Sequence, residues 1–132
     1  MTKIIDKVGW ILIQNQKLLG VRSYGKDLFY IPGGKREAGE SDIETLTREV
    51  MEELSVQITD GIQFLGEFSA PADGKKEGVI VTVQSYQAHY LGQLMPSAEI
   101  EEIRWLGTND YEACSNVTIE VIKALVEKGW VV

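Results

Sequence analysis

The sequence has almost no cysteine and no long apolar run, and both absences restrict where the protein works. A single cysteine, Cys114, excludes an intramolecular disulfide and fits a reducing compartment. No uninterrupted apolar stretch approaches the roughly 20 residues that span a bilayer. The first residues alternate in polarity and carry charges, unlike the apolar run of a signal peptide. We therefore predict a cytoplasmic protein with no membrane partner.

Basic residues are also outnumbered, with 13 Lys and Arg against 20 Asp and Glu and a formal net charge of −7. Binding to a nucleic-acid backbone needs a basic surplus that displaces counterions, so no nucleic-acid polymer is expected as the main partner. Basic residues do gather at Lys35 and Arg36 and at Lys75 and Lys76, which suits a small phosphorylated molecule. The 132 residues, 44% hydrophobic and 25% charged, predict one globular domain over residues 1–132.

One stretch predicts a well-specified amphipathic helix. Ser41, followed three residues later by Glu44, is a capping-box pattern, so Ser41 is the expected N-cap. Apolar residues then recur at spacings of three and four and predict a stripe that faces a core. This stripe consists of Ile43, Leu46, Val50 and Leu54.

Carboxylates gather on another side of the same helix. Glu49, Glu52 and Glu53 fall within about a quarter of its circumference, where like charges repel by roughly 0.2–0.5 kcal/mol per pair. Such a cluster is either a solvated helix face or a site for a hard divalent cation. The double glycine Gly33–Gly34 and the carboxylate Glu40 precede the helix, and glycine lets the main chain approach a ligand closely. Together these features favour the cation.

From position 34 to position 56 the chain resembles the signature of the Nudix hydrolases. That signature runs Gly, five residues, Glu, seven residues, Arg-Glu, an aliphatic residue, one residue, Glu-Glu, one residue, Gly and an aliphatic residue. One position departs from it, because Ser55 stands where the family has glycine. If the helix ends there in a left-handed residue, serine costs on the order of 1 kcal/mol relative to glycine. The matching residues are Gly34, Glu40, Arg48, Glu49, Val50, Glu52, Glu53 and Val56.

The resemblance implies a Nudix-type α/β/α sandwich, with a mixed β-sheet between helices, that cleaves a diphosphate bridge with Mg²⁺, for which Mn²⁺ can substitute. It implies that Glu49, Glu52 and Glu53 hold the metal together with the carbonyl group of Gly33. Glu52 and then Glu53 are the candidates for the base that activates water.

The resemblance also assigns supporting roles. Arg48 is expected to hold a carboxylate in position, and Glu40 is expected to be supportive rather than catalytic. Gly34 and Lys35 are expected at the substrate, where Lys35 reaches a phosphate group.

Some members of the family recruit one more carboxylate late in the chain. The run SAEIEEIRW offers Glu99, Glu101 and Glu102. Glu99 is favoured because it lies in a loop before a short predicted strand. A solvated acidic loop is an equally good interpretation of this run.

The remaining pattern predicts alternating strands and helices, which is typical of an α/β domain. Asn15–Gln16 predicts a tight turn between the first two strands, and Asp60–Gly61 predicts a turn inside the fourth. Ser115 or Asn116 is expected to cap a closing helix with an apolar stripe at 119, 122, 125 and 126. The predicted strands cover residues 4–13, 17–22, 28–31, 56–68, 79–90 and 103–106, with a mobile loop at 69–78.

The compact chain favours a nucleoside triphosphate substrate, cleaved to a nucleoside monophosphate and pyrophosphate by a monomer or homodimer. The alternatives are a nucleoside diphosphate, a nucleotide sugar or ADP-ribose, and a catalytically idle nucleotide-sensing module. Pro71 follows Val56 at a spacing seen in members that cleave ADP-ribose, whereas no tyrosine has the spacing associated with diadenosine polyphosphates. Asn116 is a candidate for a base edge or a helix cap. The aromatic candidates for stacking on a base are Tyr24, Phe29, Tyr30, Phe68, Tyr86, Tyr90 and Trp105.

Overall fold

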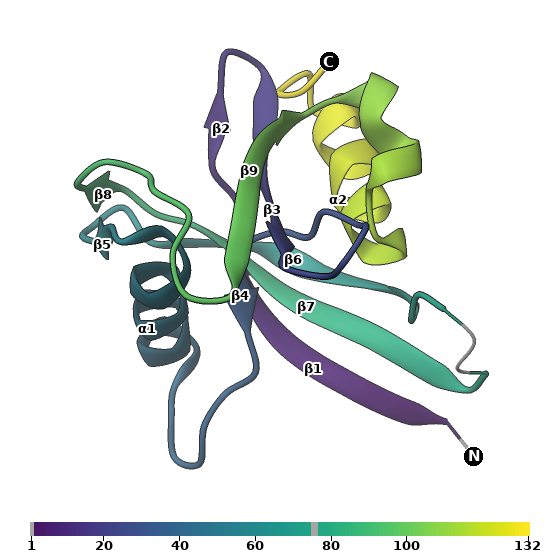
Figure 1. Cartoon of the computed structure of the whole chain (residues 1–132), viewed down its shortest axis with the longest axis horizontal. Helices are drawn as coiled ribbons and strands as arrows, with labels where there is room; N and C mark the ends of the chain where they lie inside the picture. The colour runs from purple at the N-terminus through teal and green to yellow at the C-terminus, as the bar shows by residue number, and fades with distance from the viewer. Residues whose placement is uncertain (1, 75–76) are drawn as a thin grey trace.

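A four-stranded mixed sheet forms the centre of the fold in a computed structural model that describes residues 2–74 and 77–132 (Figure 1). The strand order is β4-β1-β7-β6, in which β1 and β7 are parallel and the other neighbours are antiparallel. The strand β4 consists of the double glycine alone. The bounds are β1 Lys3–Trp10, β4 Gly33–Gly34, β6 Gln63–Pro71 and β7 Val79–Gln87.

The remaining strands form two smaller antiparallel sheets. The sheet β2-β3-β9 begins with a hairpin whose turn residues, Asn15 and Gln16, have φ values of 51° and 61°. Positive φ at both positions is what a two-residue hairpin turn of type I′ requires, and the predicted turn is confirmed. The other sheet pairs β5 with β8. The bounds are β2 Ile13–Gln14, β3 Lys17–Ser23, β5 Gln57–Ile58, β8 Tyr90–Leu91 and β9 Ile100–Leu106.

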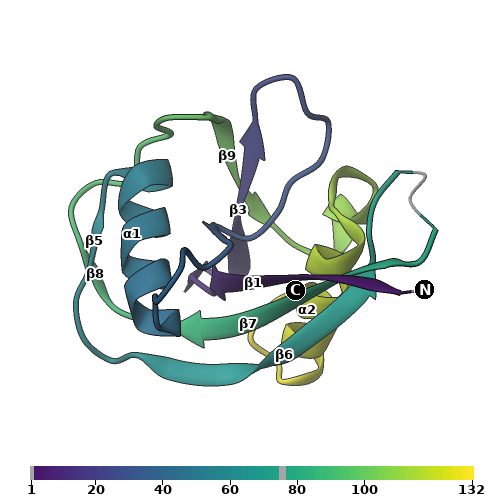
Figure 2. The same ribbon diagram turned by 90° about the horizontal axis from the view of Figure 1, so that it is seen from below.

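The helices α1 (Asp42–Leu54) and α2 (Asn116–Glu127) cover opposite faces of the central sheet, and a 3₁₀ helix, η1 (Thr108–Ala113), precedes α2. Val8 and Trp10 of β1 pack in one buried cluster with α1. Figure 2 shows that the end of β7 also lies beside α1. Val81 and Val83 of β7 pack in a second cluster with α2. In the parallel register Val8 is paired with Gln84, so these two sets point to opposite faces. The predicted α/β/α arrangement is confirmed.

The local signals for the helix ends are also confirmed. The Ser41 N–H donates to Glu44 Oε1 at 2.9 Å, and the Glu44 N–H donates to Ser41 Oγ at 3.1 Å. The N-cap of α2 is Ser115, which leaves Asn116 as its first helical residue. In the described part of the chain, no helix has the length and apolar character needed to cross a bilayer.

Several element predictions are wrong in detail. Residues 28–31 form no strand, because Phe29 bridges only to Cys114 and Tyr30 only to Val21, so neither neighbour extends the pairing. The strand β6 continues to Pro71, which shortens the expected loop, and β9 begins earlier than expected, at Ile100. Lys75 and Lys76 lie outside the described residues. Ile43 is 47% exposed rather than part of the buried stripe.

Ser55 ends α1 in the left-handed conformation, with φ 59° and ψ 29°, and its Oγ lies 2.6 Å from Ser97 Oγ. We expect Ser55→Gly to be more stable than Ser55→Ala by about 1 kcal/mol, because both variants lose the hydroxyl contact but only glycine removes the left-handed strain. Urea unfolding of the two variants measures this difference. Equal stabilities would contradict it.

Candidate functional site

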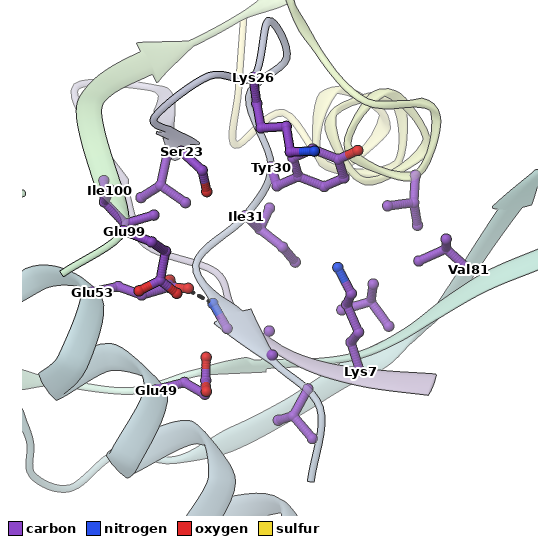
Figure 3. A pocket seen from close by; sticks show the side chains of 17 residues that line it. Lys7, Ser23, Lys26, Tyr30, Ile31, Glu49, Glu53, Val81, Glu99 and Ile100 are labelled. Carbon is purple, nitrogen blue, oxygen red and sulfur yellow. Dashed lines mark hydrogen bonds between the residues drawn. The ribbon is translucent and has the colours of Figure 1, made fainter. Parts of the chain in front are cut away.

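A pocket of about 420 Å³ opens at the edge of the central sheet beside β4. Its walls come from β1, β3 and the segment after it, β4, the second half of α1, β7, the start of β9 with the residue before it, and the first turn of α2. Glu49, Glu53 and Glu99 line one side of it, as Figure 3 shows. The structure therefore brings two carboxylates of the acidic helix together with the late carboxylate that the sequence favoured.

The two glycines of β4 make room for these carboxylates. A Cβ atom on Gly34 would lie 2.3 Å from Glu49 Oε2, and one on Gly33 would lie 2.0 Å from the Val8 carbonyl oxygen. Gly33 also has φ +145°, which side chains rarely adopt. Its N–H donates to Glu53 Oε1 at 3.1 Å. A side chain at position 34 would therefore fill the space that the Glu49 carboxylate occupies, and one at position 33 would collide with the main chain of β1.

Glu53 is a carboxylate in an unfavourable environment. Its side chain is buried, with 6% of the residue exposed. The pKa of Glu53 is raised to about 8, mainly by burial and to a lesser extent by Glu49 and Glu99, while the hydrogen bond from Gly33 and the charge of Lys7 act in the opposite direction. Burial also raises the pKa of Glu49, although Arg48 acts in the opposite direction. Both glutamates would be stabilised as anions by a cation in the pocket.

The donor set fits a hard divalent cation. Mg²⁺ and Mn²⁺ prefer carboxylate and carbonyl oxygens, and Glu49, Glu53, Glu99 and the main chain of Gly33 line the same pocket. As the side chains stand, no three acidic, histidine or cysteine residues of the described chain converge tightly enough to enclose an ion. Glu49 Oε1 instead accepts a hydrogen bond from Arg48 Nη1 at 2.7 Å. Arg48 thereby engages one of the two carboxylate oxygens of Glu49.

Arg48 and Glu40 form the support of this site. Arg48 donates from Nε to Glu40 Oε2 at 2.7 Å and from Nη2 to Glu40 Oε1 at 2.8 Å. Arg48 is the main reason why the pKa of Glu40 falls to about 2, and the Glu37 N–H and the Thr45 hydroxyl contribute. Because Nη1 of the same guanidinium binds Glu49, the pair restricts the orientation of that glutamate.

Other predicted site residues lie outside the pocket. Glu52 has a half-exposed side chain whose Oε2 is 3.6 Å from Arg48 Nη1. Lys35 is exposed, and only its carbonyl group takes part, as an acceptor for Arg48 Nη2. Glu101 and Glu102 form ion pairs with Arg22 at 2.8 and 3.0 Å. Of the three late carboxylates, only Glu99 lines the pocket.

Sequence reasoning missed Lys7, Ser23 and Lys26, which also line the pocket. β1 also carries Lys3 and Asp6, so the local pattern does not single out Lys7, whose partners come from segments distant in the sequence. Of the seven aromatic candidates only Tyr30 lines this pocket. The Asn116 side chain instead donates to the Pro71 carbonyl group at 3.1 Å.

The raised pKa of Glu53 predicts a pH dependence of metal-free stability. Its ordinary value is 4.5, so between pH 4.5 and pH 8 the folded state retains a proton that the unfolded state has lost. The free energy of unfolding therefore falls as the pH rises through this window, by at most about 4–5 kcal/mol. Urea unfolding in EDTA at pH 5 and pH 8.5 measures the fall. Glu53→Gln should remove most of it, and an unchanged fall in that variant would contradict the assignment.

Comparison with known proteins matches this chain to one family model and to a curated relative. The family model described as the NUDIX domain matches residues 4–124. The asymmetrical bis(5'-nucleosyl)-tetraphosphatase of Rattus norvegicus is 32% identical over 101 residues, which cover 74% of this chain and 67% of that protein.

Two solved structures have a similar fold. The solution structure of the E. coli ORF135 protein has a TM-score of 0.71 at 24% identity, covering 96% of this chain and 91% of that one. A bifunctional NMN adenylyltransferase/ADP ribose pyrophosphatase from Francisella tularensis, complexed with AMP and a Mn ion, has a TM-score of 0.66 at 23% identity. It covers 97% of this chain, which in turn covers 42% of it.

Proposed function

Because this chain belongs to the Nudix hydrolase family, we propose that it hydrolyses a diphosphate linkage in a nucleoside triphosphate, with release of a nucleoside monophosphate and pyrophosphate. The observation that carries this proposal is the pocket in which Glu49, Glu53 and Glu99 meet beside the glycines of β4. A diphosphate is anionic and is repelled by such a pocket unless cations lie between them. The substrate and the carboxylates therefore require the same divalent ion.

Glu49, Glu53, Glu99 and the carbonyl group of Gly33 would hold Mg²⁺ or Mn²⁺ from inside the pocket, and Glu52, which lies outside it, would join them by turning its half-exposed side chain toward the ion. Such an ion acidifies bound water and neutralises charge on phosphoryl oxygens. Arg48, fixed by Glu40, orients Glu49 for this role.

The protein's own carboxylates handle the proton. The water oxygen forms a bond to phosphorus while the bridging P–O bond breaks, and the bridging oxygen leaves with its phosphate group. Glu53 accepts the proton of water inside the pocket, or Glu52 accepts it from the solvent-exposed side. The two candidate bases differ in their access to solvent, because Glu53 is buried and the side chain of Glu52 is half-exposed.

A second candidate substrate is a dinucleoside tetraphosphate. It is favoured by the 32% identity to a bis(5'-nucleosyl)-tetraphosphatase, although the chain lacks the tyrosine expected for that class. The chemistry would be the same, with one nucleoside monophosphate and one nucleoside triphosphate as the two products.

The test is a substrate panel with Mg²⁺, with Mn²⁺ and with EDTA. It contains nucleoside triphosphates and diphosphates, diadenosine tetraphosphate, ADP-ribose and a nucleotide sugar, and the products are separated by chromatography. We expect triphosphates to yield a nucleoside monophosphate and pyrophosphate and to have the highest kcat/KM of the panel. In EDTA we expect no hydrolysis. Tight binding without turnover of any compound would overturn the proposal and favour a nucleotide-sensing module.

A further inference from the structure

The pocket has two ends of opposite charge. Glu49, Glu53 and Glu99 lie at one end, and Lys7, Lys26 and Tyr30 line the other (Figure 3). The proposed chemistry uses only the acidic end. The basic end is built by β1 and by the segment that follows β3, which are distant in the sequence.

Lys7 is the most informative group at the basic end. Its side chain is half-buried and points into the pocket, with Nζ 5.2 Å from the centre of the Tyr30 ring. Burial lowers the pKa of Lys7. Glu53, Glu49 and Asp73 attract it only over a distance, since no hydrogen bond joins a described carboxylate to its ammonium group. The Tyr30 ring is the neighbour of this partly desolvated ammonium group, but a ring offers no hydrogen-bond acceptor oxygen. A ligand that supplies acceptor oxygens would satisfy its free donors.

The neighbours of Lys7 add donors and few acceptors. Lys26 is held through its backbone, because its carbonyl group accepts from Arg22 Nη1 at 3.0 Å and its N–H donates to the Ser23 carbonyl group. The Tyr30 hydroxyl group donates to Asp73 Oδ2 at 3.4 Å, and this hydrogen bond engages the Asp73 carboxylate. A lysine has three donors and no acceptor. This end of the pocket therefore suits a ligand group that only accepts hydrogen bonds and disfavours an amino group.

We propose that Lys7, assisted by Lys26, binds acceptor oxygens on the part of the substrate that lies away from the carboxylates, and so determines which nucleotides are hydrolysed. This inference rests on the proposed nucleotide hydrolysis. Two parts of a nucleoside triphosphate carry such oxygens: the keto group of a base such as hypoxanthine or guanine, and the terminal γ-phosphate group. The structure thereby assigns a specificity role to a residue outside the Nudix signature.

The experiment compares kcat/KM of the wild type and Lys7→Met for ITP, ATP and IDP. ITP and ATP differ at position 6 of the base, which carries a keto oxygen in ITP and an amino group in ATP, whereas ITP and IDP differ by one phosphate group. Lys3→Met is the matched control, because Lys3 is an exposed lysine of the same strand that does not line this pocket. Lys7→Arg keeps the charge and should retain the substrate preference of the wild type.

We expect Lys7→Met to lower kcat/KM for ITP by about 10- to 100-fold, the usual effect of removing a hydrogen bond to a charged group. A much smaller loss for ATP identifies the keto oxygen as the ligand, and a much smaller loss for IDP identifies the phosphate group. Equal losses for all three compounds, or no loss beyond that of Lys3→Met, would overturn the inference. A wild-type protein that hydrolyses none of them would instead contradict the proposed function.

Discussion

Glu53→Gln should lower metal-dependent turnover by about 10²- to 10⁴-fold, the range for a group that transfers a proton in the transition state. The glutamine keeps the shape of the side chain but removes its charge and its basicity. Because the buried carboxylate is unfavourable without metal, the same variant should unfold at a higher urea concentration than the wild type at pH 8 in EDTA. Steady-state kinetics with the best nucleotide substrate and urea unfolding measure the two effects.

Two further variants make this prediction specific. Glu120→Gln is the control, because Glu120 is a half-exposed glutamate on α2 outside the candidate active-site pocket. Glu52→Gln removes the neighbouring carboxylate, whose side chain is half-exposed, and we expect it to lose turnover without gaining metal-free stability. Near-normal turnover in both Glu52→Gln and Glu53→Gln would show that neither carboxylate belongs to the catalytic machinery.

Gly33→Ala should be the most damaging substitution for the fold of the site. Its Cβ would lie 2.0 Å from the Val8 carbonyl oxygen, and the φ of +145° excludes an easy backbone adjustment. Because the obstacle is main chain rather than a flexible side chain, β4 must separate from β1. We expect a loss of about 2–4 kcal/mol in the free energy of unfolding, together with loss of Mg²⁺-dependent activity.

Gly39→Ala is the matched control for this substitution. Gly39 has φ +82°, but a Cβ there would meet no atom within 4 Å. It should therefore cost only the strain of a left-handed alanine, about 1 kcal/mol. Urea unfolding of both variants compares the two, and equal losses would mean that the contact with Val8 does not matter.

The features that the sequence predicts well are those set by neighbouring residues. The capping box of Ser41 and Glu44 and the turn at Asn15–Gln16 depend on groups three residues apart or fewer, and the structure contains both. Ser55 is left-handed at the end of α1, which is the case for which a cost relative to glycine was expected. The spacing of the signature also placed Glu49 and Glu53 on one side of a helix, which lines the pocket.

The features that the sequence predicts poorly depend on distant partners. Residues 28–31 have the composition of a strand, but Phe29 and Tyr30 each find only one bridging residue, so the pairing does not continue. Ile43 fits the apolar stripe, yet it remains 47% exposed, whereas Thr45 in the same turn of α1 is fully buried. Lys7 is a surface residue by its type, and only the packing of β1 against the segment after β3 turns it into a pocket residue.

Hydrolysis of a nucleoside triphosphate in ¹⁸O-labelled water tests the central claim most directly. The purified protein is incubated with Mg²⁺ and the best triphosphate of the panel, and the products are analysed by mass spectrometry. We predict equal amounts of a nucleoside monophosphate and pyrophosphate, with one ¹⁸O atom in one of the two products and no reaction in EDTA. Release of inorganic phosphate with a nucleoside diphosphate, or a rate unaffected by EDTA, would contradict the assignment of this pocket as a metal-dependent site that cleaves triphosphates to monophosphates.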